Sequence, residues 1–400
     1  MLDVVVHGAT GFVGRLVAAE LAAAGASDVR VGLSGRSKER LRAVRDDLGV
    51  DWPLLVTDAH DPASVAELAA STRVVATTVG PYHRYGLPLV EACAAAGTSY
   101  CDLTGETLFV RRSHEAAHAR ARETGARIVH SAGFDSVPSD LGVLLLHERV
   151  QADGAGTLGE TALALVAAKG GVSGGTVDSA RAELAEMADP AARRILADPY
   201  ALSPDRAADP RGDDEKDPVL PGRDALLGRW VAPYPFGPHD SRIVRRSNAL
   251  LGHAYGPGFR YRERLAVGAG PVAPVLAGLV TAGLGAFAGG MRFGPTRAVL
   301  DRVLPSPGSG PSEQRRRSGY FRVEVHTRTS TGAHYVATVA ADSDPGYGGT
   351  AVIFGQVALG LALDKPASRG GVLTPAYALG PLLIRRLQDR GLTLTTERRG

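Results

Sequence analysis

The sequence predicts an α/β protein, with an N-terminal Rossmann parallel sheet followed by a second α/β (α+β) domain. Three observations lead to this prediction. A β-branched run at Val4–His7 ends directly in a glycine-rich turn, a strand-then-helix rhythm repeats up to about residue 130, and the rhythm changes after Ser139. Alternating strands and helices are typical of a parallel sheet covered by helices.

Short apolar runs bounded by turn residues predict the strands of the first sheet. These runs are Val4–His7, Val29–Leu33, Leu54–Val56, Val74–Thr77, Tyr100–Leu103 and Arg127–His130. Segments of helical periodicity separate them, such as Arg15–Ala24 and Leu87–Ala96, each followed by a glycine. The predicted first domain therefore covers residues 1–130.

Longer elements follow from residue 131. Apolar and polar residues alternate, as in half-buried strands, over Leu158–Ala167, Phe321–Arg328 and His334–Ala341. Thr350–Leu363 and Pro375–Arg390 have the pattern of closing helices. We therefore predict a second domain over residues 131–373, and a C-terminal helix and tail over residues 374–400.

Charge and cysteine content disfavour several classes of protein. The 400 residues include 45 Lys and Arg against 42 Asp and Glu, a net charge of +3, and the basic residues are dispersed, which disfavours nucleic-acid binding. Cys93 and Cys101 are the only cysteines and lack metal-ligand spacing, so we predict no metal site and a reducing, cytoplasmic location. The first ten residues read as strand and turn, which leaves no room for a signal peptide.

The turn Gly8-Ala-Thr10-Gly11-Phe12-Val13-Gly14 has the spacing of a nucleotide-phosphate cradle. Gly8 lets the chain leave the strand in a tight turn, Gly11 lacks the Cβ that would block a pyrophosphate, and Gly14 lets the helix pack closely on the sheet. A glycine-rich turn without a ligand is the alternative. The strand before the turn and the helix after it favour a dinucleotide cofactor.

The end of the second predicted strand indicates which dinucleotide binds. Ser34-Gly35-Arg36-Ser37 stands where an NAD-selective site normally carries Asp or Glu. A guanidinium beside small hydroxyl side chains suits the 2′-phosphate of NADP, because it donates two parallel hydrogen bonds to phosphate oxygens. We therefore predict NADP(H) as the cofactor. A solvated surface charge is the alternative role of Arg36.

Ligands of an open parallel sheet gather at the carboxyl ends of its strands, so the residues that follow the later strands are candidates for the nicotinamide pocket. The Gly80-Pro81 backbone can pass close to a cofactor ribose. Tyr82 and His83 are the first candidates for a proton donor, and Asp135 is the next. The alternatives are packing for Tyr82, a surface or ribose contact for His83, and a turn-organising role for Asp135.

The segment Val267–Met291 has no charged residue over a length sufficient to cross a bilayer. Its seven glycines and two prolines make it a weakly hydrophobic helix, which disfavours a membrane span. The remaining alternatives are burial within the protein, an interface such as that of a homodimer, and peripheral contact with a membrane.

Further motifs extend over nearly the whole chain. They are GATGFVGR at 8–15, GRS at 35–37, VGPYHRYGLPLVEAC at 79–93, YCDLTGE at 100–106, IVHSAGFDSVPSDLG at 128–142, SGGT at 173–176, PGFRYRE at 257–263, DPGYGGTA at 344–351 and GGVLTPAYALG at 370–380. As a set they resemble the saccharopine dehydrogenase-like superfamily, and within it the trans-acting enoyl reductase group. Two positions near the expected pocket depart from the pattern: Ala132, where relatives often have Cys, and His83, where a small residue is common.

The resemblance implies a Rossmann domain bound to NADP(H), a second domain on the substrate side of the cleft, and reduction of a carbon–carbon double bond. The implied substrate is a small-molecule or carrier-bound acyl intermediate of polyketide or lipid type. The superfamily also contains enzymes that act on amino-acid imines, so an imine or amine oxidoreductase is one alternative, and a non-catalytic NADP-binding protein is another. Arg260 and Arg262 are isolated cations that fit an acidic carrier protein or a solvated strand face, rather than a cluster for the several carboxylates of saccharopine.

Overall fold

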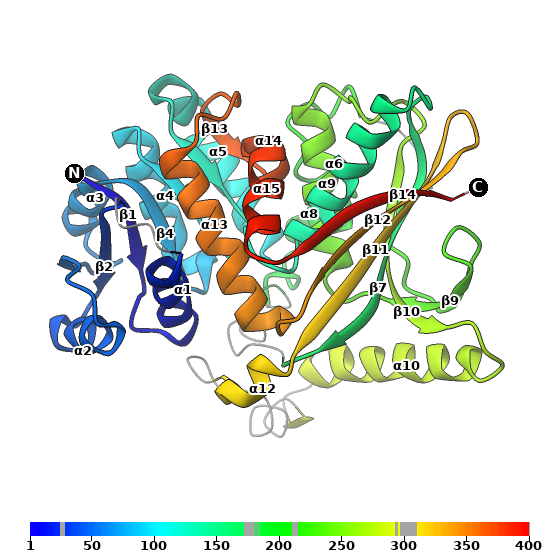
Figure 1. Cartoon of the computed structure of the whole chain (residues 1–400), viewed down its shortest axis with the longest axis horizontal. Helices are drawn as coiled ribbons and strands as arrows, with labels where there is room; N and C mark the ends of the chain where they lie inside the picture. The colour runs from blue at the N-terminus through cyan, green and yellow to red at the C-terminus, as the bar shows by residue number, and fades with distance from the viewer. Residues whose placement is uncertain are drawn as a thin grey trace.

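The computed structural model describes residues 1–24, 29–171, 181, 183, 185–209, 215–292, 295–296 and 310–399. It contains two seven-stranded sheets that lie side by side, with helices between them and around them (Figure 1). The α/β fold class is as predicted. The SGGT motif at 173–176 lies outside the described residues.

The first sheet is parallel throughout and has the strand order β13-β6-β5-β4-β1-β2-β3. Its strands are β1 (Leu2–His7), β2 (Val31–Gly35), β3 (Leu54–Val56), β4 (Thr72–Thr77), β5 (Ser99–Cys101), β6 (Arg127–Val129) and β13 (Gly371–Leu373). The connecting helices are α1 (Phe12–Ala23), α2 (Lys38–Leu48), α3 (Pro62–Ser71), α4 (Tyr82–Ala96) and α5 (Thr107–Thr124). The order of the first six strands is that of a Rossmann sheet, whose ligand crevice opens where β1 and β4 diverge.

The seventh strand of this sheet comes from near the end of the chain. β13 pairs in parallel with β6, and α13 (Thr350–Leu363) packs on α1, β1, β4 and β5. Both elements lie within residues 131–373, which the sequence assigns to the second domain, so that boundary does not separate the two sheets. β13 lies far from the strand-then-helix rhythm of residues 1–130, so that rhythm does not mark it as a strand of the first sheet.

The second sheet is mixed and has the strand order β14-β12-β11-β7-β10-β9-β8. Its strands are β7 (Leu158–Lys169), β8 (Gly222–Asp224), β9 (Arg229–Pro233), β10 (Arg260–Gly268), β11 (Tyr320–Thr329), β12 (His334–Ala341) and β14 (Thr393–Arg399). The three predicted strands of this region are therefore confirmed. The C-terminal segment contains two helices, α14 (Pro375–Ala378) and α15 (Pro381–Asp389), and it also contributes the edge strand β14, where a tail was expected.

The described residues of this half of the chain also form the helices α6 (Val137–Ala152), α8 (Pro190–Ala197), α9 (Gly237–Leu250), α10 (Ala273–Arg292) and α12 (Glu313–Arg317). In Figure 1, α6 and α9 lie near the helices between the sheets, whereas α10 runs along the lower edge of the molecule. Most side chains of α10 are exposed, so the helix from Val267–Met291 is not buried in the monomer.

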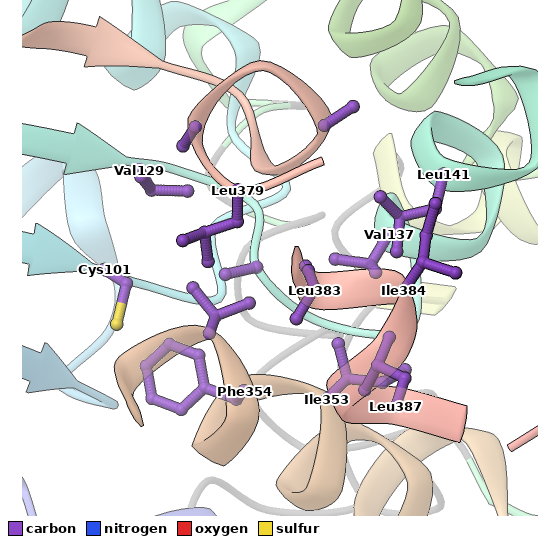
Figure 2. Close-up of a cluster of buried hydrophobic side chains, with 14 of the residues drawn as sticks. Cys101, Val129, Val137, Leu141, Ile353, Phe354, Leu379, Leu383, Ile384 and Leu387 are labelled. Carbon is purple, nitrogen blue, oxygen red and sulfur yellow. The ribbon is translucent and has the colours of Figure 1, made fainter. Parts of the chain in front are cut away.

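One hydrophobic core joins the two halves. Figure 2 shows Cys101 and Val129 at the ends of β5 and β6 facing Phe354 of α13 and Leu379, which lies between α14 and α15. The same cluster continues through α15 to Val137 and other residues of α6. Because this core fixes α6 against the first sheet, it holds the second domain over the carboxyl ends of β5 and β6.

Candidate functional site

The glycine-rich turn has the geometry of a phosphate cradle. Gly8 adopts φ +85°, and a Cβ there would lie 2.8 Å from Val79 Cγ2. A Cβ on Gly14 would lie 2.9 Å from Ala9 Cα and closer still to the carbonyl oxygen of Gly8. The turn and the close approach of α1 to β1 therefore both require glycine.

The first turn of α1 fits an anion. Gly11 is the N-cap, no side chain caps the helix, and its first turn contains no acidic residue. The backbone N–H groups at this end and the positive end of the helix dipole would therefore be available to a pyrophosphate, as the motif predicts. Thr10 lies beside Gly35 at the end of β2, and Val13 packs against the hydrophobic core.

The second half of the chain covers the cradle through Phe12. The Phe12 ring packs edge-to-face on Tyr347, with ring centroids 4.9 Å apart, and the Arg316 guanidinium lies 5.3 Å above it. Tyr347 belongs to a single π-helical turn, Pro345–Gly349, whose backbone the Asp344 carboxylate caps. The DPGYGGTA motif thus acts as a support for the phosphate turn.

The residues predicted to select the 2′-phosphate do not all face solvent. Arg36 is exposed at the end of β2, and Ser37 caps α2 by accepting a hydrogen bond from the Arg40 N–H. Ser34 is fully buried, where its hydroxyl donates to Thr57 Oγ1 at 3.0 Å and lies 3.0 Å from His7 Nδ1. The Ser34 side chain therefore points into the protein, because residues along a strand alternate between faces, and its cofactor contact stays a prediction.

The turn after β4 meets the turn after β5 at Glu106. The Glu106 carboxylate accepts the backbone N–H groups of Tyr82 and His83, at 3.1 and 2.7 Å, and it lies 3.2 Å from His83 Nδ1. It therefore occupies the N-terminus of α4 and orients the His83 ring, which is partly exposed. The Gly80–Pro81 peptide bond that precedes these residues is cis, and Gly80 is exposed.

Tyr82 is placed as a packing residue. Its ring stacks on Phe109, and its hydroxyl accepts the Leu103 N–H at 3.2 Å and donates to the Thr77 carbonyl at 3.4 Å. Burial raises the pKa of the hydroxyl well above its usual value. These contacts match the packing alternative for Tyr82 and tie β4 to the turn after β5.

Tyr82→Phe therefore tests the two roles of this residue. Loss of the hydroxyl leaves the Leu103 N–H without its acceptor, which we expect to cost about 1–3 kcal/mol in the free energy of unfolding. Urea unfolding and steady-state turnover measured on the same preparation separate the roles. A fall in turnover of ~100-fold or more at unchanged stability would instead identify Tyr82 as the proton donor.

Asp102 organises the ends of β5 and β6. Its carboxylate accepts the Tyr100 hydroxyl at 2.9 Å and the Ser131 N–H at 3.1 Å, and it lies 2.7 Å from His130 Nδ1. All of these groups are buried. A carboxylate with so many partners serves to shape the loops rather than to contact a substrate.

The second domain reaches this edge of the sheet through His239, near the start of α9. His239 Nε2 lies 2.8 Å from the Ser131 hydroxyl, and His239 Nδ1 lies 3.0 Å from the Thr107 hydroxyl. Ser131 has φ +57°, a left-handed conformation that its bonds to Asp102 and His239 stabilise. Burial lowers the pKa of His239 to about 3, so the ring is neutral near pH 7.

Asp135 lies in the turn between β6 and α6, beside two buried carboxyl groups of the second domain. Asp240 of α9 accepts the Ser136 hydroxyl at 2.6 Å, and Glu263 of β10 accepts the Tyr261 hydroxyl at 2.8 Å. Burial raises the pKa of Asp135 to about 6 and that of Glu263 to about 8. Burial, together with the charges of Glu263 and Asp135, raises the pKa of Asp240 well above its usual value.

This carboxyl cluster, Asp135, Asp240 and Glu263, can hold protons near neutral pH at the edge of the predicted nicotinamide pocket. Asp135 is the partly exposed member, whereas Asp240 and Glu263 are buried. Sequence reasoning singled out Asp135 but missed the other two, which lie over 100 residues further along the chain. Glu263 closes the PGFRYRE motif, which is the one sequence signal that marks it.

Comparison with known proteins connects this geometry to a family. Residues 4–129 match the model of the saccharopine dehydrogenase NADP binding domain. A trans-acting enoyl reductase of Mycobacterium ulcerans is 47% identical over 99% of this chain and 98% of its own, and one of Mycobacterium bovis is 46% identical over the same shares. A Mycobacterium tuberculosis protein, provisionally named for the same activity, is 50% identical over 99% of this chain and 97% of its own.

A solved structure supports the fold. Apo saccharopine dehydrogenase (L-Glu forming) from Saccharomyces cerevisiae is 14% identical and superimposes with a TM-score of 0.51 over 100% of both chains. At this identity the likeness concerns the arrangement of the two sheets. The architecture is therefore that of a saccharopine dehydrogenase fold, with an NADP-binding first domain.

Proposed function

Because the chain belongs to the trans-acting enoyl reductase family and is an NADP-dependent oxidoreductase, we propose that it reduces the carbon–carbon double bond of an acyl substrate of polyketide or lipid type with NADPH. The observation that carries the proposal is the 46–50% identity with enoyl reductases over nearly the full length of both chains. The cradle formed by Gly8, Gly11 and Gly14 supports it, because its geometry fits a pyrophosphate.

Different residues of the chain bind different parts of NADPH. The N-terminus of α1 receives the pyrophosphate, and the exposed Arg36 guanidinium pairs with the 2′-phosphate. NADPH, when bound, supplies the hydride that the β-carbon of the double bond accepts. Asp102 and His239 hold the turns after β5 and β6, at the sheet edge where the nicotinamide is expected.

Asp135 supplies the proton that the α-carbon needs after hydride transfer. Among the three predicted donors it combines partial exposure with a pKa near neutrality, about 6, whereas the Tyr82 hydroxyl is buried and bonded to backbone. Burial alone raises the pKa of Asp135, and Asp240 and Glu263, whose pKa values are also raised by burial, complete the carboxyl cluster. In this proposal His83, which Glu106 orients, donates a hydrogen bond to the substrate carbonyl.

The pairing of the β10 arginines within the protein supports the proposal of an apolar substrate. Arg260 pairs with Glu215 at 3.2 Å, and Arg262 pairs with Asp224 and Glu160, both at 2.8 Å. These guanidinium groups are therefore engaged within the protein. This arrangement disfavours both a saccharopine-like polycarboxylate and an acidic carrier as their partner.

Cofactor binding followed by turnover in the same sample tests the proposal. Purified protein is titrated with NADPH and with NADH, and oxidation is then followed after addition of enoyl thioesters or cyclic imines. We expect selective NADPH binding and oxidation with an enoyl thioester. Oxidation with a cyclic imine alone would identify the imine reductase instead, and tight binding with no turnover on either class would contradict a catalytic role on these substrates.

Arg36→Ala tests cofactor selection. Loss of the guanidinium is expected to weaken NADPH binding by about 10-fold or more and to leave NADH binding unchanged, because NADH has no 2′-phosphate. Arg40→Ala is the matched control, since Arg40 is also exposed near the start of α2. Equal effects on NADPH and NADH would show that Arg36 acts as a general surface charge.

A further inference from the structure

The helix α10 exposes an apolar surface that the described part of the protein leaves uncovered. The exposed large apolar side chains of α10, of Val272 just before it, and of the segment that leads into β8 are Val219 (72%), Leu220 (71%), Val272 (67%), Val275 (63%), Leu276 (46%), Leu279 (64%) and Phe287 (38%). We call these seven residues the α10 apolar surface. Exposed apolar side chains gathered in this number on one helix and the segment beside it are typical of an interaction site.

Among the residues that the structure describes, two helical stretches are apolar and long enough to span a membrane, and their surroundings distinguish them. Pro345–Leu363 is 78% buried and contributes Phe354 to the central core, so it is a core helix. Ala273–Met291 is 11% buried. Of these two stretches, only Ala273–Met291 is therefore exposed enough to contact a membrane or another molecule.

The chemistry of α10 favours lipid over a protein partner. No residue from 265 to 291 is charged, and Thr281, the one hydroxyl residue of the helix, donates its hydroxyl to the Ala277 carbonyl at 2.8 Å. Protein interfaces usually contain about one hydrogen bond per 100–200 Å². This helix offers almost no side-chain donor or acceptor for such bonds, whereas a hydrocarbon phase requires none.

The charges that border α10 favour an anionic lipid surface. On the neighbouring segment 215–224, the exposed charged residues are Lys216 and Arg223, both cationic. The acidic residues of the segment are engaged with cations: Glu215 with Arg245 and Arg260, Asp217 with Arg242, and Asp224 with Arg262. The exposed charged residues of this segment, Lys216 and Arg223, are therefore both cationic.

A second basic element lies along the same edge of the molecule. In Figure 1, α12, of sequence EQRRR, lies with α10 along the lower edge. Arg315 and Arg317 of α12 are exposed, and Glu313 pairs with Arg317 at 2.7 Å. Basic residues around an apolar helix are the pattern of a helix that lies in a membrane interface.

We propose that the α10 apolar surface docks on an anionic lipid membrane, with α10 lying in the plane of the interface rather than spanning it. The glycines of the helix give it too little hydrophobicity for a stable span, whereas its exposed leucine, valine and phenylalanine side chains suffice for peripheral insertion. Membrane docking is independent of the reaction proposed above, although it would place the enzyme beside lipid-like acyl substrates.

Vesicle flotation of the full-length protein tests the proposal. We expect binding to vesicles of phosphatidylcholine with about 30% phosphatidylglycerol, and weaker binding to phosphatidylcholine alone or at high salt. The double variant Val275→Glu/Leu279→Glu should reduce the partition coefficient by at least ~10-fold, because it places two charges in the apolar surface. Both positions are exposed, so the variant should fold normally.

Matched variants distinguish vesicle binding through the α10 apolar surface from nonspecific binding of the protein to vesicles. Val56→Glu replaces an exposed valine of the first sheet and should leave vesicle binding unchanged. Lys216→Glu/Arg223→Glu should weaken binding to the anionic vesicles only. NADPH binding, measured in parallel, should be the same for all these variants.

Two results would overturn the proposal. The first is absence of binding to either type of vesicle by protein that binds NADPH. The second is a stable dimer in sedimentation experiments that the Val275→Glu/Leu279→Glu variant dissociates, because α10 would then be a subunit interface.

Discussion

Replacing Gly14 with alanine is expected to abolish cofactor binding at micromolar NADPH. The new Cβ would lie 2.9 Å from Ala9 Cα and within contact distance of the Gly8 carbonyl, and both are backbone atoms that cannot rotate away. α1 would have to move outward, which displaces the N–H groups that receive the pyrophosphate. We expect NADPH affinity to fall at least ~100-fold and the free energy of unfolding to fall by about 1–3 kcal/mol.

Fluorescence titration with NADPH and urea unfolding measure the two effects. Gly283→Ala is the control, because Gly283 lies within α10 with no atom near its would-be Cβ. That variant should bind NADPH normally and gain about 1 kcal/mol from helix propensity. Normal NADPH affinity in Gly14→Ala would show that the turn is not the phosphate cradle.

The phosphate turn was predictable because its function depends on local chain geometry. One turn and the start of one helix require glycine at Gly8, Gly11 and Gly14. The structure places all three glycines as that spacing requires. The same reasoning predicted the first six strands of the parallel sheet, because each is a short apolar run with turn residues at its ends.

Features that depend on distant parts of the chain could not be predicted in this way. β13 becomes a strand because β6 offers an open edge more than 240 residues earlier, and its three residues lie outside the strand-then-helix rhythm of residues 1–130. Ser34 fits a cofactor contact by position in the sequence, but its side chain faces His7 and Thr57. The face on which a residue lies near the end of a strand depends on the register of the whole sheet.

The proposed site likewise combines a residue that was predictable from local sequence with residues that were not. Asp135 could be found because it follows a strand at the ligand-binding edge. Asp240, whose pKa the charges of Asp135 and Glu263 raise, and Glu263 itself come from α9 and β10, and only tertiary folding brings them beside Asp135. A cluster assembled from three distant segments leaves no spacing signal in a single sequence.

Asp135→Asn is expected to lower turnover with an enoyl thioester by at least ~100-fold while NADPH affinity stays the same, because the amide cannot supply the proton. The wild-type rate should be highest below about pH 6 and fall about tenfold per unit above it, since only the protonated carboxyl acts and its pKa is about 6. The variant's residual activity should lack this dependence.

The same substitution should not destabilise the protein near pH 7, which separates catalysis from folding. The pKa of Asp135 is raised from 3.8 to about 6, so its stabilising contribution is complete below pH 3.8 and is lost as the pH rises through 6. Above that pH the buried charge costs about 3 kcal/mol, a cost that the neutral amide avoids. Unfolding at pH 7.5 should therefore show Asp135→Asn to be at least as stable as the wild type. Full turnover in that variant would exclude Asp135 as the proton donor and leave His83, which Glu106 orients, as the group to test next.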